Sequence, residues 1–367
     1  MMALREFVAG NGPMALTLGG FAIGFLFGAL VFKTNFCTMG SISDIVSFGD
    51  YRRFRAWMLA AAVAIIGAQL LELAGVVELS RSMYLAPNVN WAGNVLGGLM
   101  FGYGMVFAGG CASRNLARVG AGDLRALMAL IVLGIFAYIA IGGLLGPVRA
   151  WLEQSTAVSL AGVNAPSQGL GDLMSAGLGL DRAAAQLIVS AALVIAALVY
   201  CFKDGDFRGS AVHVASGVGV GLCVVAGWAL TGLAFDELAD RPVAPISLTF
   251  VRPAGDTLEW LQRTTALGLP GFGVATVFGT ILGSFATAVA MGRFKVTTFS
   301  DKGDTVRVLS GAALMGIGGV LALGCTVGQG ITGISTLAIG SLISFASIVV
   351  GGFAGMRAFE RILMAEA

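Results

Sequence analysis

Charge is scarce in this sequence. Only 11% of its 367 residues are Asp, Glu, Lys or Arg, whereas a soluble domain carries about 25%. Hydrophobic residues make up 57%, and the mean hydropathy is +0.89. This composition excludes an ordinary soluble domain and predicts an all-α integral membrane protein embedded in a lipid bilayer. The net charge of +2 provides no basic surface of the kind that binds nucleic acid, so we expect no nucleic-acid partner.

Histidine and paired cysteine motifs are also lacking. The one histidine, His213, argues against a histidine-based metal site. The five cysteines stand far apart with no Cys-x-x-Cys pair, so the sequence supports neither a zinc knuckle nor a thioredoxin-type motif. We therefore expect no metal, no cofactor, no catalytic residue and no enzyme activity.

Long apolar runs, in contrast, are frequent. A helix needs about 20 apolar residues to cross a bilayer, and the sequence predicts nine such spans in a single membrane domain, residues 1–367. The predicted spans are 14–32, 54–77, 91–109, 123–146, 183–202, 210–231, 271–292, 306–323 and 340–360. The two long connections, 147–182 and 232–270, are expected to be interfacial or external loops that contain short helices.

Three of these spans end at a cysteine. Gly109 and Gly110 precede Cys111, and Gly324 precedes Cys325; Cys37 likewise ends an apolar run. Each cysteine leads into a segment too short to span a bilayer, which predicts short re-entrant helices. Irregular backbone at membrane depth is tolerated only where protein buries it or where it lines a cavity.

The order of spans and breaks predicts an internal repeat. Residues 14–146 form a first half, residues 183–202 a linking span, and residues 210–360 a second half. The sixth span corresponds to the first, and five is an odd number, so the two halves would lie in opposite orientations. Such an inverted repeat about a pseudo-two-fold axis is typical of transporters, whose sites lie at the repeat interface near the midplane.

The breaks further predict an anion site. A helix that begins inside the membrane has unpaired N–H groups, which together with the helix dipole favour an anion. Cysteine is small, polarizable and a weak hydrogen-bond donor, which suits a soft, sulfur-bearing anion. The candidate transport residues are Cys37, Cys111, Cys325, Gly109, Gly110, Gly324, Arg114, Arg118, Thr326 and Gln329.

A simpler interpretation must be weighed, because a cysteine in a membrane helix can be merely a small apolar residue. That interpretation fits Cys201 and Cys223, which lie within or at the end of ordinary apolar runs. It fits Cys111 and Cys325 less well, because both stand at equivalent breaks of the predicted repeat.

Basic residues predict the orientation. Most of the 22 Lys and Arg residues lie in connections that follow odd-numbered spans. Because cytoplasmic connections are enriched in Lys and Arg, the C-terminus is expected in the cytoplasm and the N-terminus in the periplasm.

Three motifs resemble those of a known family. FCTMGSISDI, GGLMFGYGMVFAGGCASRNLARVGAGDL and GIGGVLALGCTVGQGITGISTLAIGS are similar to motifs of the YeeE/YedE family of sulfur-compound transporters, whose studied members include thiosulfate importers of bacterial inner membranes. The resemblance implies an hourglass-shaped fold and three cysteines that hydrogen-bond to thiosulfate, which match Cys37, Cys111 and Cys325. It also implies a cytoplasmic sulfur-carrier protein as a partner of some members. This chain departs from the family pattern at Ser43 and Arg114, where members tend to have arginine and glycine.

The expected function is therefore import of thiosulfate or a related sulfur anion past central cysteines. One alternative is a transporter of another soft sulfur or selenium species. A second is a membrane enzyme that transfers sulfur or electrons through its thiols.

Overall fold

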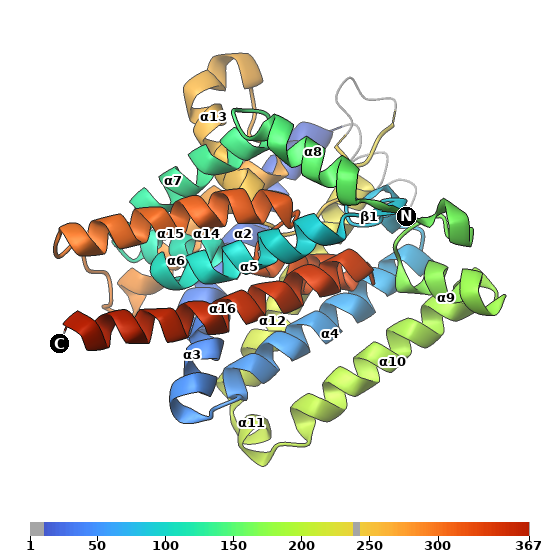
Figure 1. The fold of residues 1–367 in the computed structure, drawn as a ribbon, viewed down its shortest axis with the longest axis horizontal. Helices are drawn as coiled ribbons and strands as arrows, with labels where there is room; N and C mark the ends of the chain where they lie inside the picture. Colours follow the sequence, from blue (N-terminus) through green and yellow to red (C-terminus); the bar gives the residue numbers. More distant parts are fainter. Residues whose placement is uncertain (1–10, 238–242, 367) are drawn as a thin grey trace.

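The computed structural model of the protein describes residues 11–237 and 243–366, which are almost entirely helical (Figure 1). Within these ranges, nine helical segments are long and apolar enough to cross a membrane, which confirms the predicted number. They are built on α2 (Gly12–Thr34), α4 (Arg52–Leu73), α5 (Trp91–Phe107), α7 (Leu124–Ile141), α10 (Arg182–Phe202), α12 (Ala211–Leu233), α14 (Phe272–Ala290), α15 (Lys302–Leu321) and α16 (Ile339–Glu366).

Shorter elements interrupt or connect these spans. The helices are α3 (Thr38–Phe48), α6 (Ala112–Gly120), α8 (Gly146–Thr156), α9 (Leu170–Leu178), α11 (Gly205–Gly209), α13 (Val251–Leu267), the 3-10 turns η1 (Leu79–Arg81) and η2 (Leu160–Val163), and the π-helix η3 (Gly328–Gly333). The strands β1 (Asn88–Val89) and β2 (Val158–Ser159) form one antiparallel pair. In Figure 1, α8, α9 and β1 gather at the end of the molecule opposite the end of α16.

The helix termini carry the expected sequence signals. Pro13 stands in the first turn of α2, where its missing N–H costs nothing. The Asp181 carboxylate accepts hydrogen bonds from the N–H groups of Ala183 and Ala184 at the start of α10. These local features set where each span begins.

Glycines allow the spans to pack closely. A Cβ placed on Gly283 of α14 would lie 2.0 Å from the carbonyl oxygen of Phe25 in α2, and one placed on Gly28 would lie 2.1 Å from that of Thr280. Such approach of backbones, with small residues four positions apart, is the usual way in which membrane helices associate.

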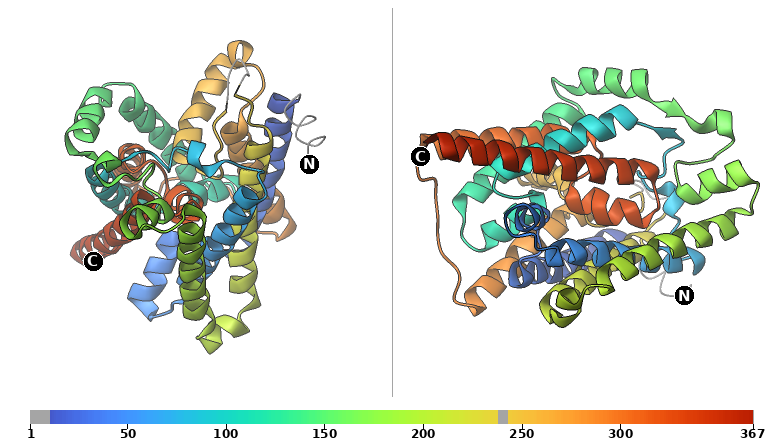
Figure 2. Two further views of the ribbon diagram at one scale, coloured as in Figure 1. Left: turned by 90° about the vertical axis from the view of Figure 1, so that its right-hand side faces the viewer. Right: turned by 60° about the horizontal axis from the view of Figure 1, so that its bottom comes forward.

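The packing partners form a regular pattern. Helix α2 packs along α14, and α4 packs along α12; α5 packs along α16, and α7 packs along α15. In addition, α2 contacts α12 and α5 contacts α15. Figure 2 shows these helices crossing the molecule between its two ends.

The sequence analysis expects the connection 232–270 to be an interfacial or external loop with short helices. It does contain the helix α13, but part of it lies inside the protein. Its extended segment ends at Leu248 and Phe250, both of which are fully buried, and α13 begins directly afterwards. Phe250 stacks on Phe27 of α2 with ring centroids 5.2 Å apart. The segment therefore enters the core of the helix bundle before α13 leaves it.

Candidate functional site

The three cysteine breaks share one backbone geometry. Two residues before each cysteine, the chain adopts the left-handed conformation, with φ of 56° at Asn35, 71° at Gly109 and 58° at Leu323. In each break the next residue donates its N–H to the carbonyl five residues earlier: Phe36 to Val31 (3.2 Å), Gly110 to Met105 (2.8 Å) and Gly324 to Gly319 (2.7 Å). This is the bond of a Schellman helix end, so each cysteine stands where one helix stops and the next begins.

Cys37 is the N-cap residue of α3. It is extended, with φ −160° and ψ 128°, and its Sγ accepts a hydrogen bond from the N–H of Gly40 at 3.4 Å. Phe36 before it stacks on the indole of Trp57 with centroids 4.6 Å apart. The thiol is 4% exposed, so it lies inside the protein at the start of a helix.

Cys111 is the N-cap residue of α6 and is 1% exposed. Gly109 and Gly110 have φ of 71° and 151°, which side chains disfavour, and this explains why two glycines precede the thiol. Its Sγ lies 3.3 Å from the hydroxyl of Ser113 and within hydrogen-bonding reach of the Cys37 thiol. The structure therefore brings two of the three break cysteines close together.

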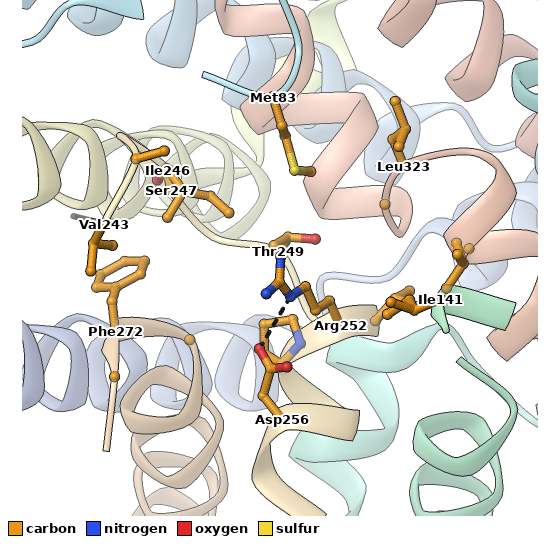
Figure 3. A pocket seen from close by; sticks show the side chains of 18 of the residues that line it. Met83, Ile141, Val243, Ile246, Ser247, Thr249, Arg252, Asp256, Phe272 and Leu323 are labelled. Carbon is orange, nitrogen blue, oxygen red and sulfur yellow. Dashed lines mark ion pairs between the residues drawn. The ribbon is translucent and has the colours of Figure 1, made fainter. Parts of the chain in front are cut away.

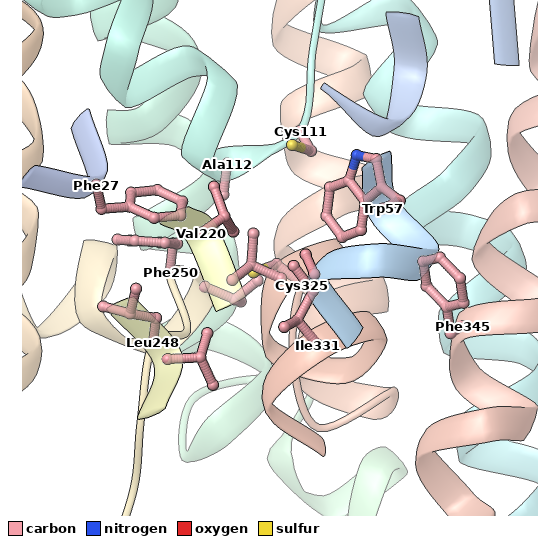
Figure 4. Close-up of a cluster of buried hydrophobic side chains, with 14 of the residues drawn as sticks. Phe27, Trp57, Cys111, Ala112, Val220, Leu248, Phe250, Cys325, Ile331 and Phe345 are labelled. Atoms are coloured by element: carbon pink, nitrogen blue, oxygen red, sulfur yellow. The ribbon is translucent and has the colours of Figure 1, made fainter. Parts of the chain in front are cut away.

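Cys325 is fully buried and also precedes a helical turn. Its Sγ accepts a hydrogen bond from the N–H of Gly328 at 3.3 Å and faces the N–H of Phe250 at the start of α13. Thr326 beside it lies within reach of the Cys111 thiol. Figure 4 shows Cys111 and Cys325 within the same buried cluster.

Gly324 differs from the other two predicted glycines. The left-handed residue of this break is Leu323, not Gly324. A Cβ on Gly324 would meet Gln329 at 3.4 Å, an ordinary contact. Gln329 is 2% exposed and donates its side-chain N–H to the carbonyl of Ala322, so it stabilises this helix end.

The two arginines after Cys111 have different surroundings. Arg118 donates to Asp123 (2.7 Å), to the carbonyl oxygen of Gly109 (2.7 Å) and to the side-chain oxygen of Asn115 (3.1 Å). Arg114 is half-buried and makes no hydrogen bond or ion pair with any described residue. Its charge acts on Cys37. Among the described residues the Arg114 side chain is therefore an unpaired cation near the thiols, while Arg118 fixes the glycine turn.

Several buried polar atoms near the thiols have no hydrogen-bond partner within the described ranges. They are Oγ1 of Thr38, Oγ1 of Thr326, Oε1 of Gln329 and Nε1 of Trp57. Sequence reasoning missed Thr38 and Trp57. A signal was present for the first, because Cys37-Thr38 and Cys325-Thr326 are the same dipeptide; an aromatic residue within an apolar run gave no such signal for Trp57.

The two remaining cysteines stand away from the breaks. Cys201 is at the end of α10, where its Sγ contacts the carbonyl oxygen of Arg55 at 3.2 Å. Cys223 lies within the uninterrupted helix α12. All five cysteines are buried free thiols, and in the part of the chain described here no group of three His, Cys, Asp or Glu side chains could hold a metal ion.

A cavity of about 730 Å³ leads toward the third break (Figure 3). It is lined by the extended segment before α13 and by Leu323 and Gly324, next to Cys325. Arg252 and Asp256 of α13 form an ion pair in it with an N–O distance of 3.6 Å. The cavity lies on the side of the molecule that carries α8, since Arg149 contributes to its wall.

The nine apolar helices found within residues 11–237 and 243–366 define a multi-pass membrane protein built around buried helix breaks. The family model described as "Sulphur transport" matches residues 33–354. The chain therefore belongs to this family, which confirms the resemblance to the YeeE/YedE proteins.

Individual relatives agree with this assignment. The chain is 27% identical over 343 residues to the thiosulfate transporter TsuA of Spirochaeta thermophila, covering 91% of this chain and 96% of the relative. It is 27% identical over 334 residues to the thiosulfate transporter TsuA of Escherichia coli, covering 86% and 87%. The probable transporter YedE of Salmonella typhimurium is 32% identical over 107 residues, covering 29% of this chain and 24% of the relative.

Proposed function

We propose that the protein imports thiosulfate or a closely related sulfur anion across the bacterial inner membrane. The observation that carries this proposal is the meeting of helix starts in the protein interior. The Cys37 and Cys111 thiols lie close together there, Thr326 lies near Cys111, and the Arg114 side chain has no ion-pair partner among the described residues. The names of the relatives that cover most of the chain support thiosulfate as the substrate.

The physical problem of such transport is desolvation. Moving an unpaired dianion out of water costs many kcal/mol, so the protein must supply donors in place of water. In the proposed path, the free N–H groups at the starts of α3 and α6 and the helix dipoles provide them. The thiols of Cys37, Cys111 and Cys325 act as neutral, polarizable donors to the sulfur anion, and Arg114 attracts it.

The proposed path passes between two inverted repeats, residues 14–146 and 210–360, joined by residues 183–202. The pattern of packing supports this division. In an inverted repeat, each helix of one half has a counterpart in the other: α2 and α12, α4 and α14, α5 and α15, α7 and α16. If each helix is exchanged for its counterpart, the packed pair α2–α14 becomes α12–α4, and the packed pair α5–α16 becomes α15–α7. All four of these pairs are present. The pairs α2–α12 and α5–α15 map onto themselves.

We further propose that the N-terminus is periplasmic and the C-terminus cytoplasmic, from the distribution of Lys and Arg. The cavity near Cys325 would then open toward the periplasm and serve as the entrance for import. A reporter fused after Ala367 that is active only in the periplasm would overturn this orientation. On the cytoplasmic side a sulfur-carrier protein is the proposed acceptor, which co-purification with the transporter would test.

Uptake of labelled thiosulfate into proteoliposomes tests the function directly. The purified protein should take up thiosulfate faster than protein-free liposomes, and unlabelled thiosulfate should compete better than sulfate, which lacks the soft sulfur atom. Equal uptake with and without the protein would reject thiosulfate as its substrate.

A further inference from the structure

The indole N–H of Trp57 is a buried donor without an acceptor. Trp57 is 1% exposed, and its Nε1 has no hydrogen-bond partner in the described part of the chain. The other fully buried tryptophan, Trp228, donates to the hydroxyl of Ser335 at 3.0 Å. Buried polar groups are almost always paired, so the orphan N–H of Trp57 calls for a partner that the protein does not itself supply.

The ring of Trp57 is held in a fixed orientation. It stacks on Phe36 at 4.6 Å with an interplanar angle of 22°, and on Phe345 at 6.0 Å with an angle of 23°. In Figure 4 the indole nitrogen lies on the side of the ring that faces Cys111. Because Phe36 directly precedes Cys37, the indole ring packs against the residue that leads into the first break.

Two hydroxyls share this property. Oγ1 of Thr38 and Oγ1 of Thr326 lack hydrogen bonds of normal geometry, although the two residues are only 1% and 0% exposed. Each follows a break cysteine, so each stands in the first turn of a helix, where backbone N–H groups are also unpaired. Two of these side chains thus stand at the positive ends of the helices that begin at Cys37 and Cys325, and the third, Trp57, stacks on the residue before Cys37.

These groups differ chemically from the thiols. An indole N–H and a hydroxyl are hard donors that suit oxygen, whereas a thiol is a weak, soft donor. A sulfur oxyanion such as thiosulfate has both kinds of atom, because terminal oxygens and a terminal sulfur share one central atom.

We infer that Trp57, Thr38 and Thr326 form an oxygen-binding subsite next to the thiols. This inference rests on the proposed function and adds to it the way in which the anion is oriented. The subsite holds the oxygen end of the anion, while Cys37 and Cys111 face its sulfur. The residues then determine specificity, because an anion that lacks oxygen leaves three buried donors unpaired.

The test replaces Trp57 by phenylalanine, which keeps an aromatic ring between Phe36 and Phe345 but removes the N–H. The matched control is Trp228→Phe, which removes an N–H that already has a protein acceptor. We expect Trp57→Phe to lower kcat/KM for thiosulfate uptake at least about tenfold, the effect of losing one hydrogen bond to a charged group. Both variants lose the same buried ring volume, so the unfolding temperature of Trp57→Phe should fall less than that of Trp228→Phe, since no protein–protein hydrogen bond between described residues is lost.

The control variant Trp228→Phe should show the reverse pattern, with a larger effect on stability than on uptake. Trp228→Phe should lower the unfolding temperature, because the bond to Ser335 is broken, and should retain uptake within a few-fold of wild type. Wild-type uptake by Trp57→Phe would overturn the subsite. Failure of wild-type protein to transport thiosulfate would instead reject the proposed function, so the two failures are distinguishable.

A second pair of variants keeps the inference testable if Trp57→Phe does not fold. Thr326→Val preserves the shape of the side chain but removes its hydroxyl, and Thr326→Ser retains the hydroxyl. We expect Thr326→Val to lose about tenfold in kcat/KM and Thr326→Ser to recover most of it. Equal uptake by the two variants would contradict a donor role for Thr326.

Discussion

The proposed mechanism depends most on Cys111, whose thiol contacts Ser113 and lies close to Cys37. Replacing Cys111 by alanine removes the sulfur at the point where the first two breaks meet. The backbone turn should persist, because it is set by Gly109 and Gly110 and held by the bond from Arg118 to the Gly109 carbonyl. The variant should therefore fold and insert normally while losing a contact to the passing anion.

The size of the effect follows from the lost hydrogen bond. A bond to a charged group contributes about 1.5–3 kcal/mol, which corresponds to roughly tenfold to more than hundredfold in rate if the contact acts in the limiting step. Cys111→Ser retains a donor but makes it shorter and harder. We expect it to keep little activity and to discriminate less against sulfate.

Uptake of labelled thiosulfate into proteoliposomes, normalised to folded protein, measures this loss. Cys223→Ala is the matched control, because Cys223 is also a buried thiol but lies within the unbroken helix α12. It should transport at the wild-type rate. In parallel, a thiol-specific alkylating reagent should block wild type, and excess thiosulfate should slow the labelling of Cys111. Full uptake by Cys111→Ala would refute the reasoning and reduce this cysteine to a packing residue.

Three further predictions follow from the same geometry. Arg114→Gln should lower kcat/KM for thiosulfate at least about tenfold with little change in unfolding temperature. Arg118→Gln should lower the unfolding temperature, because Arg118 is bonded to Gly109 and Asp123 within the protein. Identical behaviour of the two variants would refute the distinction. Gly283→Ala should destabilise the protein by about 1–3 kcal/mol, measured as its unfolding midpoint, because the new Cβ would lie 2.0 Å from a carbonyl oxygen of α2. Gly142→Ala is its control, with nothing within 4 Å, and an equal midpoint for both would contradict the close packing. Burial alone would raise the pKa of Asp123, but Arg118 and Arg125 outweigh it and hold that pKa below its ordinary value of 3.8. A carboxyl group whose pKa is lowered in the folded protein stabilises the fold at pH values above its ordinary pKa. This stabilisation is lost as the pH falls through the lowered pKa. Asp123→Asn should thus lower the unfolding temperature at pH 7, and the difference from wild type should shrink below about pH 4; a difference that is constant with pH would refute it.

Hydropathy and glycine–cysteine spacing were enough to predict the spans and the three breaks. The buried start of helix α13 was not predicted. The helix carries charged residues such as Arg252, Asp256 and Glu259, so its segment was assigned to an interfacial or external loop. Its buried start at Phe250 depends on contacts with Phe27, which is far away in the sequence. At Arg118, a candidate transport residue, the sequence analysis did not foresee the ion pair with Asp123, which lies only five residues away.

The backbone of the breaks was only partly visible in the sequence. Glycine predicts a left-handed residue, and Gly109 is one, but Asn35 and Leu323 adopt the same conformation at the equivalent positions. Asparagine tolerates that region, whereas leucine is strained there. The left-handed conformation of Leu323 is therefore imposed by its surroundings, including the bonds of Gln329 to Ala322 and of Gly328 to Cys325. The sequence placed the break near Gly324, but no local pattern could have shown that Leu323 adopts this conformation.

The shared geometry also gives a physical reason for cysteine at these positions. After a Schellman helix end, the residue two positions beyond the left-handed one becomes the N-cap of the next helix, as Cys37 and Cys111 do. Serine, threonine or aspartate at an N-cap would bind the free N–H groups firmly. Sulfur is a weak acceptor, and its contacts here are long, at 3.4 Å for Cys37 and 3.3 Å for Cys325.

A weak cap leaves the helix start available to an anion. In the proposed path, an arriving sulfur anion takes over the N–H groups that the thiol holds loosely, and the freed thiol turns its own proton toward the anion. A hydroxyl cap would resist this exchange, because its stronger bond to the backbone must first be broken. At Cys37 and Cys325 the same residue thus caps the helix start in the empty protein and gives it up to the substrate, which a harder side chain would not do. At Cys111 the side chain makes no cap bond, so the start of α6 is open from the outset.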